Sequence, residues 1–228
     1  MRPLIVGYGS SGRSPPNTPS ACFEAFDAGA DAAAVDVCET FDGVVVVGNR
    51  RTLRLLQPRD VPSWSAIEDA DLGLVFDGSA GRHRVLRIET FLQVMGPLSV
   101  QLVLDGPVRA TAWESLVDTV QRRREGETAV LAPPMQLYDC DLPEHVRRIA
   151  LLRSGEDAAE VPRRGVDGVA APARSLPSLG RLRLPKIALG CDTRSGLAAA
   201  MSSGVAAVHT ERPAWFNWAW SEPVPARL

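Results

Sequence analysis

Short apolar runs recur along the whole chain, and patterns typical of helices separate most of them. Each run is nearly continuous in apolar residues, as expected for strands that are covered on both faces. The predicted strands are LIVGYG (4–9), AAAVDV (32–37), SVQLVLD (99–105), TAVLAP (128–133), RIALLR (148–153), GVAAPA (168–173), KIALGCD (186–192) and AAVHT (206–210). The predicted helices lie at 18–29, 89–96, 111–124, 140–147 and 193–203. Strand and helix alternating about eight times predict parallel strands joined by helical crossovers.

The length of the chain decides between two architectures of this class. With 228 residues, of which 45% are hydrophobic, the chain can bury one sizeable core. Closure of the strands into a (β/α)8 TIM barrel is favoured at this length, and an open doubly wound sheet is the alternative. We predict an α/β chain in which residues 1–228 form a single barrel domain.

One apolar run does not fit the alternation. VVVV (44–47) follows the second predicted strand after only a turn that contains Asp42 and Gly43. Asp-Gly between two strand-like runs is a hairpin signal. We therefore predict a small hairpin insertion after the second barrel strand, at about residues 38–65. Two predicted helices carry clear start signals, with Thr18 before Pro19 at one and Thr193 at the other.

Composition excludes several classes of protein. The net charge of −2 gives no reason to expect nucleic acid or an anionic membrane as a partner. The four cysteines are Cys22, Cys38, Cys140 and Cys191, and none of them forms a C-x-x-C pair. This spacing argues against a disulfide framework and a zinc site, and favours free thiols. No apolar run is long enough for a signal peptide core or a membrane span. We predict a soluble, cytoplasmic protein.

The order of the motifs resembles that of the glycerophosphodiester phosphodiesterase family. The resemblance extends over nearly the whole chain and rests on six segments: SPPNT, ACFEAFDAGADAAAVDV, ETFDGVVVVGNRRTLRLL, RIETFLQVM, SVQLVLDGP and SGVAAVHTERP. The resemblance implies a TIM barrel of the phospholipase-C-like type, which agrees with the independent strand count. It also implies hydrolysis of glycerophosphodiesters by two histidines and a divalent cation, with the cation held by two acids on the second strand and one on the third.

The sequence departs from that family pattern at most of the working positions. The first histidine of the family and the arginine after it fall on Gly7 and Tyr8, and the acid of the opening loop falls on Pro16. The metal-binding acids fall on Ala34, Asp36 and Val103. The His-Asp pair of the insertion falls on Gly48 and Asn49, and the Trp-Thr stretch of the seventh strand falls on Gly190 and Cys191. Asp36 alone keeps a carboxylate, and Mg²⁺ or Ca²⁺ requires several oxygen ligands. We therefore predict no metal, no cofactor and no glycerophosphodiesterase activity.

Three residues at strand ends are the candidate catalytic groups: Asp36, Asp105 and Tyr8. Residues i and i+2 of a strand share a face, so an inward Val103 would make Asp105 point inward as well, toward Asp36 on the neighbouring strand. Two close carboxylates could act as an acid–base pair, with Tyr8 as a hydrogen-bond donor. The alternatives are that Asp105 only begins an Asp-Gly turn, and that Tyr8 only fills the mouth of the barrel.

Further polar residues near the predicted strand ends are candidates for ligand binding. They are Asn17, Asn49, Arg13, Cys191, Asp192 and His209, and Arg50 lies in the same loops. Each has a structural alternative: Asn17 can organise its own loop, His209 can be a hydrogen-bonded packing residue, and Cys191 can pack as a thiol without a nearby base. The segment PAWFNWAWSEP carries three tryptophans, which can pack the last helix, cover the mouth or form an exposed patch for a homodimer.

Two functions follow from the sequence. The first is a repurposed, metal-independent enzyme that uses acid–base chemistry of the isomerase, cyclase or lyase kind on a small, neutral or partly apolar substrate, in specialised metabolism. The alternative is a non-catalytic pseudoenzyme that binds a small ligand or a partner protein. A residual phosphoric diester hydrolase of lipid metabolism ranks last.

Overall fold

The chain folds into a closed barrel of parallel strands. The computed structural model describes residues 2–9, 13–57, 61–78, 83–123, 125–137, 141–152, 161, 165–180 and 182–221. In these ranges eight parallel strands form the barrel: β1 (Leu4–Tyr8), β2 (Ala32–Glu39), β5 (Val100–Leu104), β6 (Thr128–Ala132), β7 (Val146–Leu151), β8 (Gly168–Pro172), β9 (Lys186–Leu189) and β10 (Ala207–Thr210). Strand β1 pairs with both β2 and β10 and closes the ring. The predicted TIM barrel is confirmed, and the open sheet is excluded.

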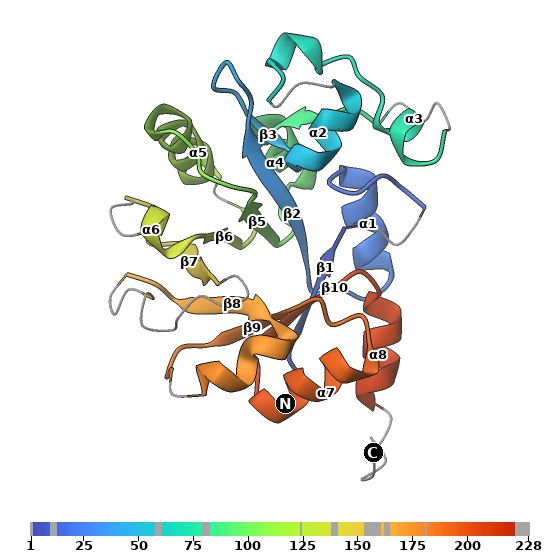
Figure 1. The fold of residues 1–228 in the computed structure, drawn as a ribbon, viewed down its shortest axis with the longest axis vertical. Helices are drawn as coiled ribbons and strands as arrows, with labels where there is room; N and C mark the ends of the chain where they lie inside the picture. The colour runs from blue at the N-terminus through green and yellow to red at the C-terminus, as the bar shows by residue number, and fades with distance from the viewer. Residues whose placement is uncertain are drawn as a thin grey trace.

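Helices cover the outside of the strands (Figure 1). They are α1 (Pro19–Asp27), α4 (Ile88–Met95), α5 (Ala110–Arg122), α6 (Pro134–Leu137), the 3₁₀ helix η3 (Ala173–Leu179), α7 (Arg194–Ser203) and α8 (Pro213–Ser221). Both predicted start signals are confirmed, because Thr18 accepts a hydrogen bond from the amide of Ala21 and Thr193 accepts one from the amide of Gly196. None of these helices, nor any other in the described ranges, is long and apolar enough to cross a membrane.

The predicted helix at 140–147 is wrong in its described part. Residues 144 and 145 form a turn, and Val146 already begins strand β7. The amide of Val146 donates to the carbonyl of Pro143, and β7 then pairs in parallel with β6. Pairing with the neighbouring strand decided the conformation of Val146 and Arg147. Cys140 lies outside the described residues.

The insertion after the second barrel strand is a hairpin, as predicted. Strand β2 continues beyond the barrel and pairs antiparallel with β3 (Val45–Val47), which pairs antiparallel with β4 (Leu86–Arg87). Between β3 and β4 the described residues form three short helices: α2 (Arg50–Leu56), the 3₁₀ helix η1 (Trp64–Ala66) and α3 (Leu72–Phe76). The elements of this segment therefore continue past residue 65, up to Arg87, where α4 follows. They enclose a core of their own, formed by Cys38, Val46, Leu53, Ile67, Leu72 and Val85.

The last helix packs against the barrel with part of its aromatic surface. In α8 the rings of Phe216 and Trp220 stack with centroids 5.8 Å apart, and the guanidinium of Arg212 lies 5.5 Å from the ring of Trp215. Phe216 is fully buried, whereas Trp218 is 55% exposed. For Trp220, together with Phe216, this arrangement agrees with the alternative that the aromatic residues of this segment pack the last helix. Self-association through the exposed Trp218 stays a prediction.

The inside of the barrel is lined mainly by small side chains. A buried cluster there combines residues at alternating positions of neighbouring strands: Val6, Ala32, Ala34, Ala129, Leu131, Ile149, Ala170, Ile187 and Ala207. Five of these nine residues are alanines, so larger side chains can enter the interior from the strand ends. Tyr8, Leu151 and Leu189 pack against this cluster from positions two residues beyond Val6, Ile149 and Ile187, and Val103 packs against it from β5.

Because side chains alternate between the two faces of a strand, Gly7 lies on the face of β1 that points away from the interior. A Cβ atom on Gly7 would lie 2.4 Å from the Cβ of Ala25 in α1 and 3.5 Å from the Cγ of Pro213. Because β1 and α1 approach so closely here, the backbone has no room for a side chain at this position. The residue that the family pattern pairs with a histidine therefore faces the helix layer, and its neighbours Val6 and Tyr8 face the interior.

We expect Gly7→Ala to lower the free energy of unfolding by about 2 kcal/mol, because the new methyl group overpacks the contact with Ala25. Urea unfolding followed by circular dichroism measures the change. In a double-mutant cycle, Ala25→Gly costs about 1 kcal/mol alone through its helix propensity, and should recover most of the loss in the Gly7→Ala background. If the losses of the two single variants simply add in the double variant, the contact between residues 7 and 25 is not the cause of the destabilisation.

Candidate functional site

The carboxylate of Asp36 is the centre of a polar cluster at the C-terminal ends of the strands. It is 7% exposed and accepts three hydrogen bonds from side chains. The hydroxyl of Tyr8 donates to Oδ1 at 2.5 Å, and the amides of Asn17 and Asn49 donate to Oδ2 at 3.1 and 2.9 Å. Neutral donors therefore satisfy both carboxylate oxygens, which is how a buried charge is stabilised without an ion pair.

The two asparagines connect Asp36 to the loops above the barrel. Asn17 has φ of 63° and uses its Oδ1 to accept the backbone amide of Asp36 at 2.7 Å. It is the one described residue other than glycine with positive φ, and asparagine tolerates this conformation. Asn49 uses its Oδ1 to cap α2, by accepting the amide of Thr52 at 2.9 Å. The cluster thus fixes the loop before α1 and the start of α2 against β2.

Tyr8 reaches Asp36 from β1, with its ring turned toward the interior of the barrel. Burial raises the pKa of the phenol far above its usual range, and the charges of Asp36, Asp105 and Glu211 raise it further. Tyr8 therefore stays protonated and acts as a donor to Asp36 throughout the physiological range. The ring fills the mouth while the hydroxyl donates to Asp36, and a hydrogen bond from Tyr8 to a ligand stays a prediction.

Asp105 has different partners from Asp36. Its Oδ2 accepts the backbone amide of Arg50 at 2.7 Å, and the Arg50 guanidinium donates to the carbonyl of Pro107 at 3.1 Å. The turn after Asp105 contains Gly106 at φ of 95°, which matches the alternative of an Asp-Gly turn. Asp105 still contributes to the raised pKa of Tyr8, so it lies close enough for its charge to act there. These contacts tie Asp105 to α2, and an acid–base pair of Asp105 with Asp36 stays a prediction.

Asp192 and Glu211 bring two further carboxyl groups to the ends of β9 and β10. Asp192 Oδ1 accepts the hydroxyl of Thr210 at 2.7 Å and the backbone amide of Glu211 at 2.6 Å. Glu211 lies against Gly9, with its Cγ 3.5 Å from where a Cβ on Gly9 would be. Burial, and then the charge of Asp192, raises the pKa of Glu211. We did not single out Glu211 from the sequence, although it is the acid of the segment Thr210-Glu211-Arg212-Pro213.

His209 and Gln101 form a hydrogen bond inside the barrel. Their Nε2 and Oε1 atoms are 2.8 Å apart, and His209 is 2% exposed. Burial lowers the pKa of His209 to about 3, so the imidazole is neutral and Nε2 carries the donated proton. Gln101 was missed in the sequence, where the available signal was one amide in an otherwise apolar strand.

Two candidates from the sequence remain, Cys191 and Arg13. Burial raises the pKa of the Cys191 thiol to about 12, so it stays protonated and is a poor nucleophile. The thiol faces the carbonyls of Ala188 and Gly196 at 3.8 and 3.9 Å, which agrees with packing. Arg13 is exposed in the loop before α1.

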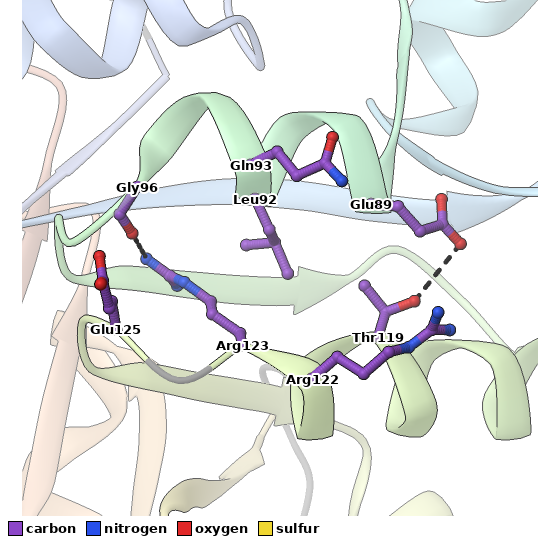
Figure 2. A pocket seen from close by; sticks show the side chains of 8 residues that line it. All are labelled: Glu89, Leu92, Gln93, Gly96, Thr119, Arg122, Arg123 and Glu125. Atoms are coloured by element: carbon purple, nitrogen blue, oxygen red, sulfur yellow. Dashed lines mark hydrogen bonds between the residues drawn. The ribbon is translucent and has the colours of Figure 1, made fainter.

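A separate pocket of about 410 Å³ lies on the outside of the barrel, between α4 and α5 (Figure 2). Figure 2 shows Glu89 of α4 opposite Thr119 of α5, whose hydroxyl donates to the Glu89 carboxylate at 3.3 Å. Arg123 closes one end by donating to the carbonyl of Gly96 at 3.0 Å. None of the candidate site residues from the sequence lines this pocket, so it is not part of the cluster around Asp36.

The donors around Asp36 do not fit the divalent cation that the resemblance implies. Ala34 and Val103 provide no ligand, and three neutral donors already contact the Asp36 oxygens. Among the residues that the structure describes, no group of three or more His, Cys, Asp or Glu side chains could hold a metal ion. Mg²⁺ and Ca²⁺ need several oxygen ligands, and the residues around Asp36 do not supply them.

Comparisons with solved structures identify the fold. No protein-family model matches the sequence, and no curated protein does. A phosphodiesterase from Oleispira antarctica in complex with the product sn-glycerol-3-phosphate is similar over 96% of this chain and 97% of its own, at 14% identity and a TM-score of 0.80. A glycerophosphodiester phosphodiesterase from Agrobacterium tumefaciens is similar over 94% of this chain and 99% of its own, at 21% identity and a TM-score of 0.72. One from Thermotoga maritima is similar over 96% of this chain and 99% of its own, at 15% identity and a TM-score of 0.72.

These comparisons show that the chain has the barrel fold of glycerophosphodiester phosphodiesterases. They contradict our interpretation of the sequence as a barrel that lost this machinery and took up isomerase, cyclase or lyase chemistry, or that only binds a ligand. The neighbours are phosphodiesterases, and one of them holds a glycerol phosphate product. We therefore correct that interpretation. The structure provides no observation in favour of a recruited chemistry.

Proposed function

We propose that this chain hydrolyses small phosphodiesters of glycerol at the mouth of its barrel. One observation carries the proposal: a phosphodiesterase that holds sn-glycerol-3-phosphate matches 96% of the chain with a TM-score of 0.80. The position of the polar cluster supports it, because Tyr8, Asp36 and Glu211 lie at the C-terminal ends of barrel strands, where TIM-barrel enzymes carry their active sites.

Arg50 is the residue we propose for binding the anionic phosphoryl group. Its guanidinium lies at the rim of the mouth, with Cζ 3.0 Å from where a Cβ on Gly106 would be. Its Nε is buried and has no hydrogen-bond partner among the described residues. A planar guanidinium suits phosphoryl oxygens because it offers several donors and a permanent charge. The backbone contact to Asp105 fixes the first residue of α2, and with it the origin of this side chain.

Glu211 is the residue we propose as the general acid. Burial, and then the charge of Asp192, raises the pKa of this carboxyl, which is the direction that a general acid requires. In the reaction, a water oxygen forms a bond to phosphorus while the bond from phosphorus to the leaving alkoxide breaks. Glu211 gives its proton to that alkoxide and regains one from solvent, and the attacking water releases one proton to solvent. Asp36 and Tyr8 hold the loops around this site.

The proposal predicts release of sn-glycerol-3-phosphate from glycerophosphocholine or glycerophosphoethanolamine, measured with a coupled dehydrogenase assay. Glu211→Gln should lower kcat/KM by roughly 100-fold or more, because the leaving alkoxide loses its proton donor. Glu125→Gln, at an exposed position beside α5, is the matched control and should leave the rate unchanged. The assay is run with EDTA and with added Mg²⁺, Ca²⁺ or Mn²⁺. If folded protein releases no product under any of these conditions, the proposal is wrong.

Three predictions from the sequence, on the partner, the compartment and the number of domains, are part of this proposal. A small molecule is the proposed partner, and the net charge of −2 supports a protein without a nucleic-acid partner. The absence of C-x-x-C spacing in the sequence supports a reducing compartment such as the cytoplasm. One domain for residues 1–228 is supported by the closure of the barrel between β1 and β10, near the two ends of the described chain.

A further inference from the structure

A polar pair crosses the apolar interior of the barrel below the mouth. His209 comes from β10 and Gln101 from β5, and β1 and β2 lie between these two strands in the sheet order. Their side chains meet because the interior at this level is lined mainly by alanines, which leave room for an imidazole and an amide. A buried hydrogen bond of 2.8 Å between two such groups fixes the orientation of both.

The imidazole of this pair contacts the aromatic ring of Tyr8. The ring centroids of His209 and Tyr8 are 5.7 Å apart and the planes are tilted by 34°. His209 stands beside Val6 in the register between β10 and β1, two residues before Tyr8 along the strand. The Tyr8 ring therefore has the imidazole beneath it and the carboxylate of Asp36 at its hydroxyl end. The contacts with His209 and Asp36 thus fix the position of the Tyr8 ring at both of its ends.

We propose that His209 is a positioning residue, which together with Gln101 holds the Tyr8 ring where its hydroxyl donates to Asp36. Gln101 orients the imidazole, the imidazole supports the ring, and the hydroxyl then satisfies Oδ1 of the carboxylate that anchors the loops of the site. The importance of this role for catalysis rests on the proposed function. The contact itself is independent of any reaction and can be tested without substrate.

Tyrosine NMR tests the proposal directly, because the chain contains only two tyrosines. In a Tyr138→Phe background, ¹³C labelling of tyrosine Cζ reports Tyr8 alone. Without changes at His209, we expect no titration of this signal up to about pH 11, since burial and nearby carboxylates keep the phenol protonated. His209→Ala should change the Cζ shift at pH 7 and start titration below about pH 11, because the ring loses its support and water reaches it.

Two companion variants separate positioning from a general loss of packing. His209→Gln can still contact both Gln101 and the ring, and should restore most of the original signal. Gln101→Leu keeps the imidazole but frees its orientation, and should shift the Tyr8 signal if Gln101 acts through His209. Ile187→Val, in the same interior cluster, is the matched control and should leave the signal unchanged.

An unchanged Tyr8 signal in folded His209→Ala, or in folded Gln101→Leu if the alanine variant does not fold, would overturn the proposal. A shifted Tyr8 signal in a protein that hydrolyses no glycerophosphodiester would leave the positioning role intact and refute the proposed function. If hydrolysis is found, His209→Ala should lower kcat, and His209→Gln should restore it. The two proposals thus fail on different measurements.

Discussion

Asp36→Asn is expected to lower the free energy of unfolding by about 3 kcal/mol and to abolish hydrolysis of glycerophosphodiesters. The carboxylate is buried and accepts from three donors: Tyr8, Asn17 and Asn49. An amide at this position must turn its own NH₂ group toward at least one of them, so a buried donor loses its acceptor. The loops held by the two asparagines would then lose their common anchor on β2.

Urea unfolding measures the loss of stability in Asp36→Asn, and two further variants serve for comparison. Tyr8→Phe removes one of the three donors and should cost about 1–2 kcal/mol. Asp118→Asn is the matched control: Asp118 is 61% exposed in α5, pairs with Arg122 four residues later, and its replacement should change stability by less than about 0.5 kcal/mol. Wild-type stability in Asp36→Asn would mean that the three hydrogen bonds contribute little, and that the cluster does not hold the loops.

The barrel could be predicted from the sequence because its signal is repeated and local. Each buried strand is an apolar run of its own, and Thr18 and Thr193 mark helix starts by chemistry that acts within three residues. The exception at 140–147 shows the limit of local signals. There the polar pattern was compatible with a helix, but the pairing of β7 with β6 could not be seen in the segment itself.

The cluster around Asp36 could be predicted only in part, because its members come from separate segments. Tyr8, Asn17, Asp36 and Asn49 were all named as candidates, but no spacing in the sequence shows that three of them donate to the fourth. The acid–base pairing of Asp36 with Asp105 stays a prediction. Neighbouring strands do bring them to one end of the barrel, but Asp105 is held by a backbone amide of α2.

Matching residues to a family pattern also gave no side-chain directions. The pattern placed a histidine position on Gly7, whereas the pleat of β1 turns that position toward α1 and turns Tyr8 inward. A comparison of sequences counts positions, but only the packing of β1 against α1 decides which of them face the interior. Gln101 and Glu211 were missed for the converse reason: each is one polar residue among many until its neighbours from other strands are known.

The stability of the protein is expected to fall as the pH is lowered from about 6.5 toward 3, with one proton taken up by His209 on unfolding. Burial lowers the pKa of this imidazole from 6.5 to about 3. Between these values the unfolded chain binds a proton at His209 and the folded chain does not, so the free energy of unfolding decreases as the pH falls. Above pH 6.5 both states are neutral at this residue, and its contribution does not depend on pH.

The expected slope from His209 alone is about 1.4 kcal/mol per pH unit within that window. Carboxyl groups also titrate there, so the measurement is the difference between wild type and His209→Gln in urea unfolding at a series of pH values. His209→Gln removes the titrating group but can keep the hydrogen bond to Gln101, and should flatten the profile by that slope. His145→Gln removes an exposed histidine and is the matched control, which should keep the profile of the wild type. Parallel profiles for wild type and His209→Gln would show that the imidazole becomes protonated without unfolding, which the apolar interior around it should not allow.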